Sequence, residues 1–190
     1  VIGLTATPFR LGHGLITEGE AIFDELIEPV KIEDLIRGGY LAPLLSKLTD
    51  ETIDVDGVAK RGGEFVEKEL QAAANQDEGN KRMVAEALKY GENRKAWLFF
   101  CTGVKHAYAM RDILRSNGVE AETVTAETSK AERDRILQEF KMGSIKALTN
   151  ADVLTTGFDY PGIDLIAFCR PTLSPGLYMQ MAGRGMRIAE

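Results

Sequence analysis

Two arginines near the end of the chain, Arg184 and Arg187, lie three residues apart in the segment QMAGRGMR, which begins at Gln180. A guanidinium stays charged in proteins and presents a rigid fork of N–H donors that suits phosphate oxygens. Two such groups, placed just after a short helix and among glycines, can reach one point on a partner surface. This pattern is typical of arginine fingers, which stabilise the charge on a phosphoryl group during its transfer.

A second group of candidate residues precedes the arginines in the segment TTGFD, residues 155–159. Gly157 has no Cβ, so the backbone there can come close to a nucleotide. Thr155 and Thr156, with the backbone amides nearby, suit the phosphates of a nucleic acid, and such contacts fix register without reading sequence. Asp159 can accept a hydrogen bond from ribose hydroxyls or hold one of the arginines.

Each residue also has a purely structural interpretation when it is taken alone. Gly157 can serve a turn, Asp159 can cap a loop beside Pro161, and an arginine pair near a chain end is by default solvated. The methionines around the arginines are expected to pack rather than to form a binding surface. It is the order and spacing of all these segments together that favours a functional interpretation.

Together with TATP at residues 5–8, the two segments resemble motifs III, V and VI of superfamily-2 helicases of the repair and restriction-associated type. The segment at Cys101 resembles motif IV, and the resemblance is best from Leu98 onward. Proteins of this family have two RecA-like domains with ATP in the cleft between them. The resemblance therefore implies that residues 1–40 are the tail of a first domain, and that residues 41–190 are the second RecA-like domain, truncated at its end.

The resemblance also assigns a role to each site residue. Arg184 and Arg187 would contact the ATP phosphates, and Gln180 would support or join them. The remaining assignments are Gly157, Asp159 and Gly183 at the nucleotide; Thr155, Thr156, Cys101 and Thr102 at the nucleic acid; and Thr5 and Thr7 in coupling hydrolysis to strand separation.

Half of an ATP site is missing from this sequence. It contains no GxxxxGK[ST] phosphate loop and no Asp-Glu pair before a strand end that would hold Mg²⁺. We therefore expect ATP with Mg²⁺ to be bound jointly with the first RecA-like domain, which would hold most of the metal's ligands. The chain alone is predicted to be inactive as an ATPase and as a helicase.

Composition and charge allow these assignments without proving them. The chain is 44% hydrophobic and 27% charged, with a net charge of −6. Residues 1–80 carry −9 and residues 81–190 carry +3, so the half with the motifs is mildly basic and permits nucleic-acid binding. No apolar run approaches the roughly 20 residues of a membrane span. The first residue is Val, which indicates a start within a longer protein.

The two cysteines, Cys101 and Cys169, each lie in an apolar run and lack metal-ligand spacing. The two histidines, His13 and His106, also lack ligand partners at useful spacing, so no metal site formed by side chains alone is expected. Buried free thiols in a reducing cytoplasm are the simplest interpretation.

Apolar strands alternate with amphipathic helices after residue 80, which predicts an α/β fold of the RecA-like kind: a parallel sheet with helices on both faces. Ligands gather at the carboxyl ends of such strands. Residues 1–7 are expected to form another short buried strand that has lost its own sheet, so self-association through it is possible. The strands expected in the sheet are 97–101, 119–124, 146–149 and 165–169.

Two other functions stay open at this point. A non-catalytic module that binds nucleic acid or a protein partner could descend from a helicase whose first domain lost its phosphate loop. A nucleotide-sugar or dinucleotide domain would share the architecture, but no glycine fingerprint follows the first strand, and such a domain leaves residues 180–187 unexplained. The leading hypothesis is the motor half of an ATP-dependent helicase or translocase, with DNA favoured over RNA.

Overall fold

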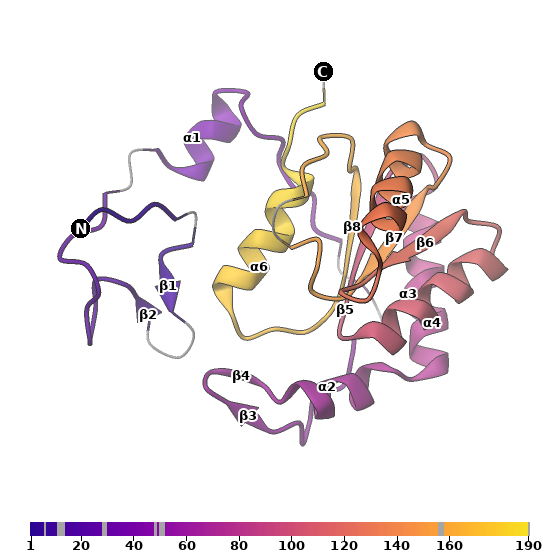
Figure 1. Ribbon diagram of the computed structural model, residues 1–190, viewed down its shortest axis with the longest axis horizontal. Helices are drawn as coiled ribbons and strands as arrows, with labels where there is room; N and C mark the ends of the chain where they lie inside the picture. Colours follow the sequence, from indigo (N-terminus) through magenta and orange to yellow (C-terminus); the bar gives the residue numbers. More distant parts are fainter. Residues whose placement is uncertain are drawn as a thin grey trace.

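The computed structural model describes residues 1–5, 7–10, 14–27, 30–47, 49, 52–155 and 158–189. Its centre is a four-stranded parallel sheet with the strand order β6-β7-β5-β8 (Figure 1). The continuous apolar runs of the sequence become strands because both faces of the sheet are covered. The strands are β5 (Trp97–Cys101), β6 (Ala121–Val124), β7 (Ala147–Asn150) and β8 (Leu165–Cys169).

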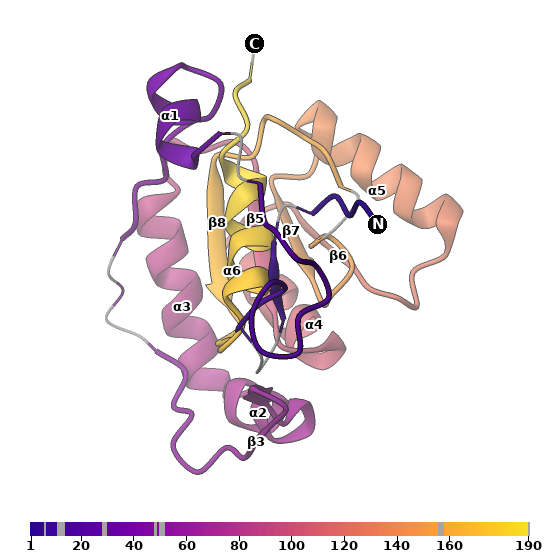
Figure 2. The same ribbon diagram turned by 90° about the vertical axis from the view of Figure 1, so that its left-hand side faces the viewer.

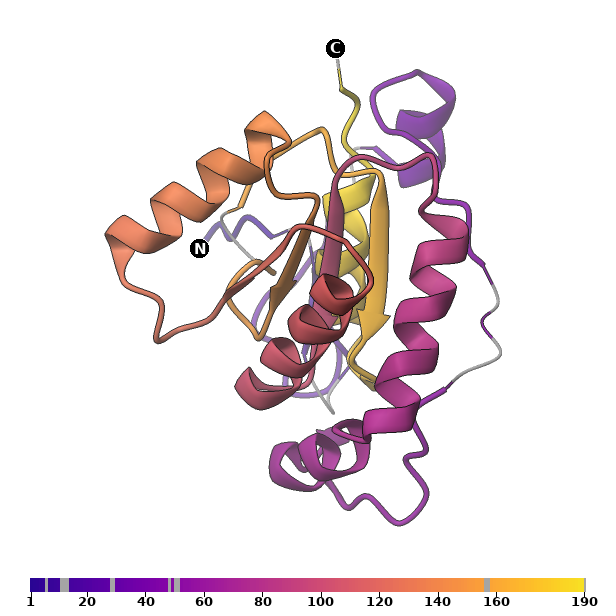
Figure 3. The same cartoon turned by 90° about the vertical axis from the view of Figure 1, so that its right-hand side faces the viewer.

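Two helices cover each face of this sheet. Side chains of a strand alternate between faces, so Trp97 and Phe99 pack in one core while Leu98 and Phe100 pack in the other. The first core includes α3 (Asp77–Tyr90) and α4 (Val104–Ser116), which lie together in front of the sheet in Figure 3. The second core includes α5 (Lys130–Met142) and α6 (Pro175–Ala182). The predicted parallel sheet with helices on both faces is confirmed.

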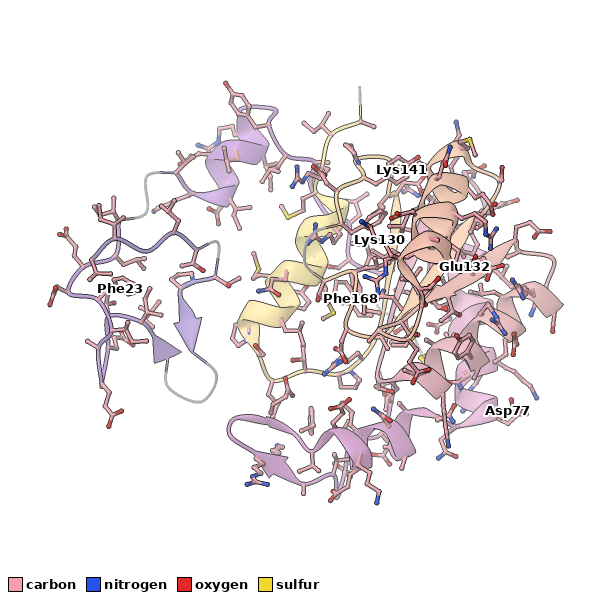
Figure 4. The ribbon with its side chains drawn as sticks, viewed as in Figure 1. Phe23, Asp77, Lys130, Glu132, Lys141 and Phe168 are labelled. Atoms are coloured by element: carbon pink, nitrogen blue, oxygen red, sulfur yellow. The ribbon has the colours of Figure 1, made fainter. Side chains whose placement is uncertain are left out.

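Serine side chains cap the first turns of α5 and α6. Ser129 Oγ accepts a hydrogen bond of 3.3 Å from the Glu132 amide at the start of α5. Ser174 Oγ does the same for the Leu177 amide at 3.2 Å, with Pro175 in the first turn of α6. An aromatic stack also holds α6 to the sheet: the rings of Phe168 and Tyr178 are 5.3 Å apart, and Phe168 points toward α6 in Figure 4.

A small hairpin and a helix precede the main sheet. Strands β3 (Lys60–Arg61) and β4 (Glu64–Phe65) pair antiparallel around two glycines with positive φ, and α2 (Glu67–Ala74) follows. The sequence predicts a helix that begins near Glu64. In the structure it begins at Glu67, because Glu64 and Phe65 pair with β3 instead.

The beginning of the chain differs from its prediction. Residues 1–7 were expected to form a buried strand, but those that the structure describes form none, and Val1, Ile2 and Leu4 are exposed. A strand is stable only when a neighbour pairs with its backbone groups, and no such neighbour lies beside the described part of this segment. The first regular elements are instead a minimal antiparallel pair and a short helix: β1 (Phe9–Arg10), β2 (Gly14–Leu15) and α1 (Ile32–Arg37).

Strand β1 lies beside α6 (Figures 1 and 2). Further along the chain, the Ala42 amide donates a hydrogen bond of 2.8 Å to the Met186 carbonyl. The start of the chain and the linker after α1 therefore both approach the region of the C-terminal arginines. No helix in the described part of the chain is both long and apolar enough to cross a membrane.

Candidate nucleotide and nucleic-acid interface

Arg184 joins the two segments that were singled out in the sequence. It lies in a single turn of 3-10 helix, η1 (Gly183–Gly185), directly after α6. Its Nη2 donates a hydrogen bond of 2.6 Å to the Thr155 carbonyl, and its Nη1 donates to the Phe158 carbonyl. One guanidinium thus holds both sides of the loop that follows β7. Two predicted site residues of that loop, Thr156 and Gly157, lie outside the described residues.

The environment of Arg184 is partly apolar. Burial lowers the pKa of Arg184, the nearby charge of Arg187 lowers it further, and Asp159 opposes both effects. The guanidinium remains a cation in spite of this, because its ordinary pKa is so high. Arg184 Nε is buried and has no hydrogen-bond partner among the described residues. Arg184 is therefore a partly desolvated cation whose Nε–H group has no acceptor among the described residues.

Arg187 has a different kind of partner. Its Nη1 lies 3.3 Å from the carboxylate of Asp159, and half or more of each side chain is exposed. Exposed ion pairs of this kind stabilise a protein by only about 0–1 kcal/mol. Arg187 can therefore exchange this carboxylate for another anion at little cost. Of the two roles predicted for Asp159, the structure shows the contact with an arginine.

Gln180 reaches the start of the chain. Its Nε2 donates a hydrogen bond of 3.5 Å to Thr7 Oγ1, and the Thr7 amide donates one of 3.0 Å to Thr5 Oγ1. The Thr7 side chain also lies 3.6 Å from the point where a Cβ on Gly176 would stand. Of the two residues proposed for coupling, Thr7 therefore contacts α6 directly, and Thr5 contacts Thr7. Gly183 has open space where its Cβ would be, so packing inside this chain does not demand a glycine there.

The side chains predicted to contact nucleic acid after β5 are not at the surface. Cys101 is 1% exposed and Thr102 is 0% exposed, because the strand end is covered by α4. The Thr155 side chain is also inward and donates a hydrogen bond of 3.3 Å to the Asp152 carbonyl. The side chains of Cys101 and Thr102 are therefore covered in this arrangement, and the assignment of the two residues to the nucleic acid stays a prediction.

A buried histidine explains the position of Thr102. The Thr102 amide and hydroxyl lie 3.3 Å and 3.0 Å from His106 Nδ1, and His106 Nε2 lies 3.0 Å from Asn80 Oδ1. An amide can only donate, so Nδ1 accepts and Nε2 carries the proton that it shares with Asn80. Burial lowers the pKa of His106 to about 4, which keeps the ring neutral.

Sequence reasoning missed the structural role of His106. Its spacing of four residues from Thr102, at the start of a helix, was the available signal. Asn80 completes the chain of hydrogen bonds but is 26 residues away from His106, so no sequence pattern connects the two residues.

The cysteines are buried free thiols, as predicted. Cys101 and Cys169 are register partners on β5 and β8. Burial raises the pKa of Cys169 to about 12 and also raises that of Cys101, so neither thiol is ionised near neutral pH. Among the described residues there is no group of three or more side chains that could hold a metal ion.

The architecture and the site together define the class of this chain. A parallel sheet with helices on both faces, whose strand-end loop is held by an arginine from the last helix, is a RecA-like α/β domain. Residues 79–189 match the helicase conserved C-terminal domain. The chain belongs to this family, as the second RecA-like domain of a superfamily-2 helicase.

Two relatives that match the chain along its whole length are named ATP-dependent helicases. The chain is 31% identical to the ATP-dependent helicase IRC3 of Saccharomyces cerevisiae, over 99% of this chain and 27% of that protein. It is 33% identical to the mitochondrial ATP-dependent helicase irc3 of Schizosaccharomyces pombe, over 100% of this chain and 31% of that protein. The chain therefore spans less than a third of the length of these relatives.

A solved structure shares the fold. Saccharomyces cerevisiae Dbp5 bound to RNA and ADP BeF3 is 25% identical, with a TM-score of 0.51, over 57% of this chain and 29% of that chain.

Proposed function

We propose that this chain is the second motor domain of an ATP-dependent nucleic-acid helicase or translocase, in which Arg184 and Arg187 act as arginine fingers. The observation that carries the proposal is their convergence on the loop after β7: Arg184 contacts its carbonyls and Arg187 contacts Asp159. The two cations thus stand at one place, on the loop that the family uses for nucleotide and nucleic acid.

The residues present fit one side of a polyphosphate substrate. Arg187 is exposed, its pair with Asp159 is exchangeable, and the backbone at Gly183 is open to a close approach. The phosphate loop and the ligands of Mg²⁺ are absent from the sequence, so a first RecA-like domain has to supply them. We infer that the chain alone does not hydrolyse ATP at a useful rate.

Contacts within this chain support a mechanical coupling between the nucleotide site and the nucleic-acid site. Arg187 would exchange Asp159 for a phosphate oxygen, and its fixed charge would stabilise the charge of the transferring group. Arg184 binds the loop that contains Thr155 and Thr156, so movement of η1 would move that loop. Gln180 would pass the same movement to Thr7 at the start of the chain.

The nucleic acid is proposed to be DNA. The preference is supported by the particular residues found in the TTGFD and QMAGRGMR segments, and not by a contact with a base. DNA and RNA therefore have to be compared directly.

The test is ATP hydrolysis by a protein in which this chain follows a first RecA-like domain with a phosphate loop. Turnover is measured without nucleic acid and with equal nucleotide concentrations of single-stranded DNA or RNA, and the chain alone is the control. We expect stimulation, greater with DNA, and no turnover by the chain alone. If the joined protein has no ATPase activity, or one that nucleic acid does not stimulate, a non-catalytic binding module is favoured instead. Steady turnover by the purified chain alone would contradict the claim that this chain holds only half of the ATP site.

A further inference from the structure

A polar cleft lies between α2 and the start of α4. Its volume is about 260 Å³. One wall comes from α2 and the residue after it, and the other comes from the first turn of α4. The lining residues are Lys68, Gln71, Ala72, Asn75, Lys105 and His106.

The cleft exists because the segment from β3 to α2, which precedes the helicase C-terminal domain at residues 79–189, is held against the carboxyl edge of the sheet. Glu64 on β4 accepts hydrogen bonds from the Thr172 hydroxyl and from the Leu173 amide at 3.0 Å, in the loop between β8 and α6. At the other end, Gln71 lies so close to Gly103 that a Cβ there would stand 2.5 Å from Gln71 Cδ. The segment from β3 to α2 thus bridges two loops at the edge where ligands of such sheets bind.

The charge of the cleft is positive. Lys68 and Lys105 are both exposed and come from different elements, and neither forms an ion pair among the described residues. No carboxylate lines the cleft. The acids of α2 have partners elsewhere on this segment: Glu67 accepts a hydrogen bond of 3.0 Å from Gln71, and Glu69 accepts one of 2.8 Å from the Ala59 amide.

The lining groups suit a phosphate. Two lysines provide the charge, and the side-chain amide of Asn75 is a neutral donor at the same opening, whereas the Gln71 amide already donates to Glu67. His106 forms part of the floor while it holds the Thr102 turn in place. No large apolar side chain lines the cleft, so neither a base nor an apolar ligand is favoured.

We propose that this cleft binds a phosphodiester of the nucleic-acid backbone, and that α2 thereby extends the binding track beyond the family domain. The proposal rests on the proposed function, since it presumes that a nucleic acid runs along this edge of the sheet. In this proposal the contacts with the nucleic acid beside the end of β5 come from Lys68 and Lys105, because the side chains of Cys101 and Thr102 are buried. Contacts of this kind position a strand and do not read its sequence.

The test is binding of a labelled single-stranded oligonucleotide by the full chain over a range of salt concentrations. Lys68→Ala and Lys105→Ala are measured singly and together. Lys89→Ala is the matched control, because it removes an exposed lysine at the far end of α3, next to the amino edge of the sheet. Each cleft variant is expected to weaken binding regardless of sequence and to reduce the salt slope by about 1, whereas Lys89→Ala leaves both unchanged.

The outcomes separate this proposal from the proposed function. If the wild-type chain binds but both cleft variants keep its affinity and salt slope, the cleft is not part of the track and the motor function stands. If the wild-type chain binds no oligonucleotide even at low salt, both are contradicted. Unchanged thermal unfolding of the variants shows that a loss of binding is not a loss of fold.

A second arm identifies the source of the phosphate. Amide resonances of Gly103 and Lys105 are followed by NMR during titration with the oligonucleotide or with inorganic phosphate at equal phosphate concentration. Shifts caused by the oligonucleotide alone support a backbone contact. Equal shifts with inorganic phosphate would assign the cleft to a free anion and overturn the proposal.

Discussion

Arg184 and Thr155 are 29 residues apart in the chain, and a hydrogen bond of 2.6 Å joins the guanidinium of one to the carbonyl of the other. The same guanidinium binds the carbonyl of Phe158, so it holds both sides of one loop. Arg187, one turn further on, is instead exposed and paired only with Asp159 among the described residues. The two proposed fingers therefore differ in what their loss would do to the fold.

Arg184→Ala is expected to lower the free energy of unfolding of the chain by about 1–3 kcal/mol, because two partly buried carbonyls lose their donor. Asp159→Ala is the matched control. It removes only an exposed ion pair and should cost about 0–1 kcal/mol. Urea unfolding of both variants measures the difference. Equal stability of the two variants would show that Arg184 does not hold the loop.

The buried His106 predicts a pH dependence of stability. Its pKa is about 4 in the folded chain, below the ordinary value of 6.5, so the unfolded chain takes up the proton first as the pH falls. The stability that is present above pH 6.5 is therefore lost as the pH falls toward 4. Between pH 7 and pH 5 this loss should be about 2 kcal/mol.

His106→Gln separates this effect from the titration of other groups. The variant is less stable at pH 7, because Thr102 and Asn80 lose their shared partner, but its stability should fall less steeply between pH 7 and pH 5. Denaturant unfolding of both proteins at several pH values measures the two slopes. Parallel curves would mean that His106 is not buried as a neutral ring.

Glu64 predicts how the accessory segment is attached. Burial acts to raise the pKa of Glu64, but hydrogen bonds from Thr172 and Leu173 outweigh it and bring the pKa below its ordinary value. Glu64→Ala should therefore release the hairpin from the loop between β8 and α6, and amide exchange in residues 57–76 should accelerate. Glu67→Ala is the control, since it removes only a hydrogen bond within α2. Exchange at the same rate in both variants would contradict this attachment.

The sheet could be predicted from the sequence, but the short strands outside it could not. The runs that became β5 and β8 are apolar throughout, so burial on both faces identified them without knowledge of their neighbours. Residues 1–7 are similarly apolar, yet those that the structure describes form no strand, because strand formation depends on a partner as much as on composition. The strands β3 and β4 have two residues each and are too short for any periodicity to show.

The spacing of the site residues was visible in the sequence, whereas their partners were not. The order of QMAGRGMR after TTGFD gave a contact between Asp159 and one of the arginines as one of two roles for Asp159. Which arginine takes backbone carbonyls and which takes Asp159 depends on how η1 lies against that loop. The burial of Thr102 depends likewise on His106 and Asn80, and no motif joins these three residues.

The most direct test of the central claim is nucleic-acid-stimulated ATP hydrolysis by a protein in which this chain follows its first RecA-like domain, wild type against Arg187→Ala. An arginine finger contributes roughly 10³–10⁵ in turnover. The account predicts a loss of that order with unchanged thermal unfolding, and near-normal turnover for the control Arg37→Ala, which removes an exposed arginine of α1 that pairs with Asp34. Turnover by Arg187→Ala within a few-fold of wild type would contradict the assignment of Arg187 as a finger.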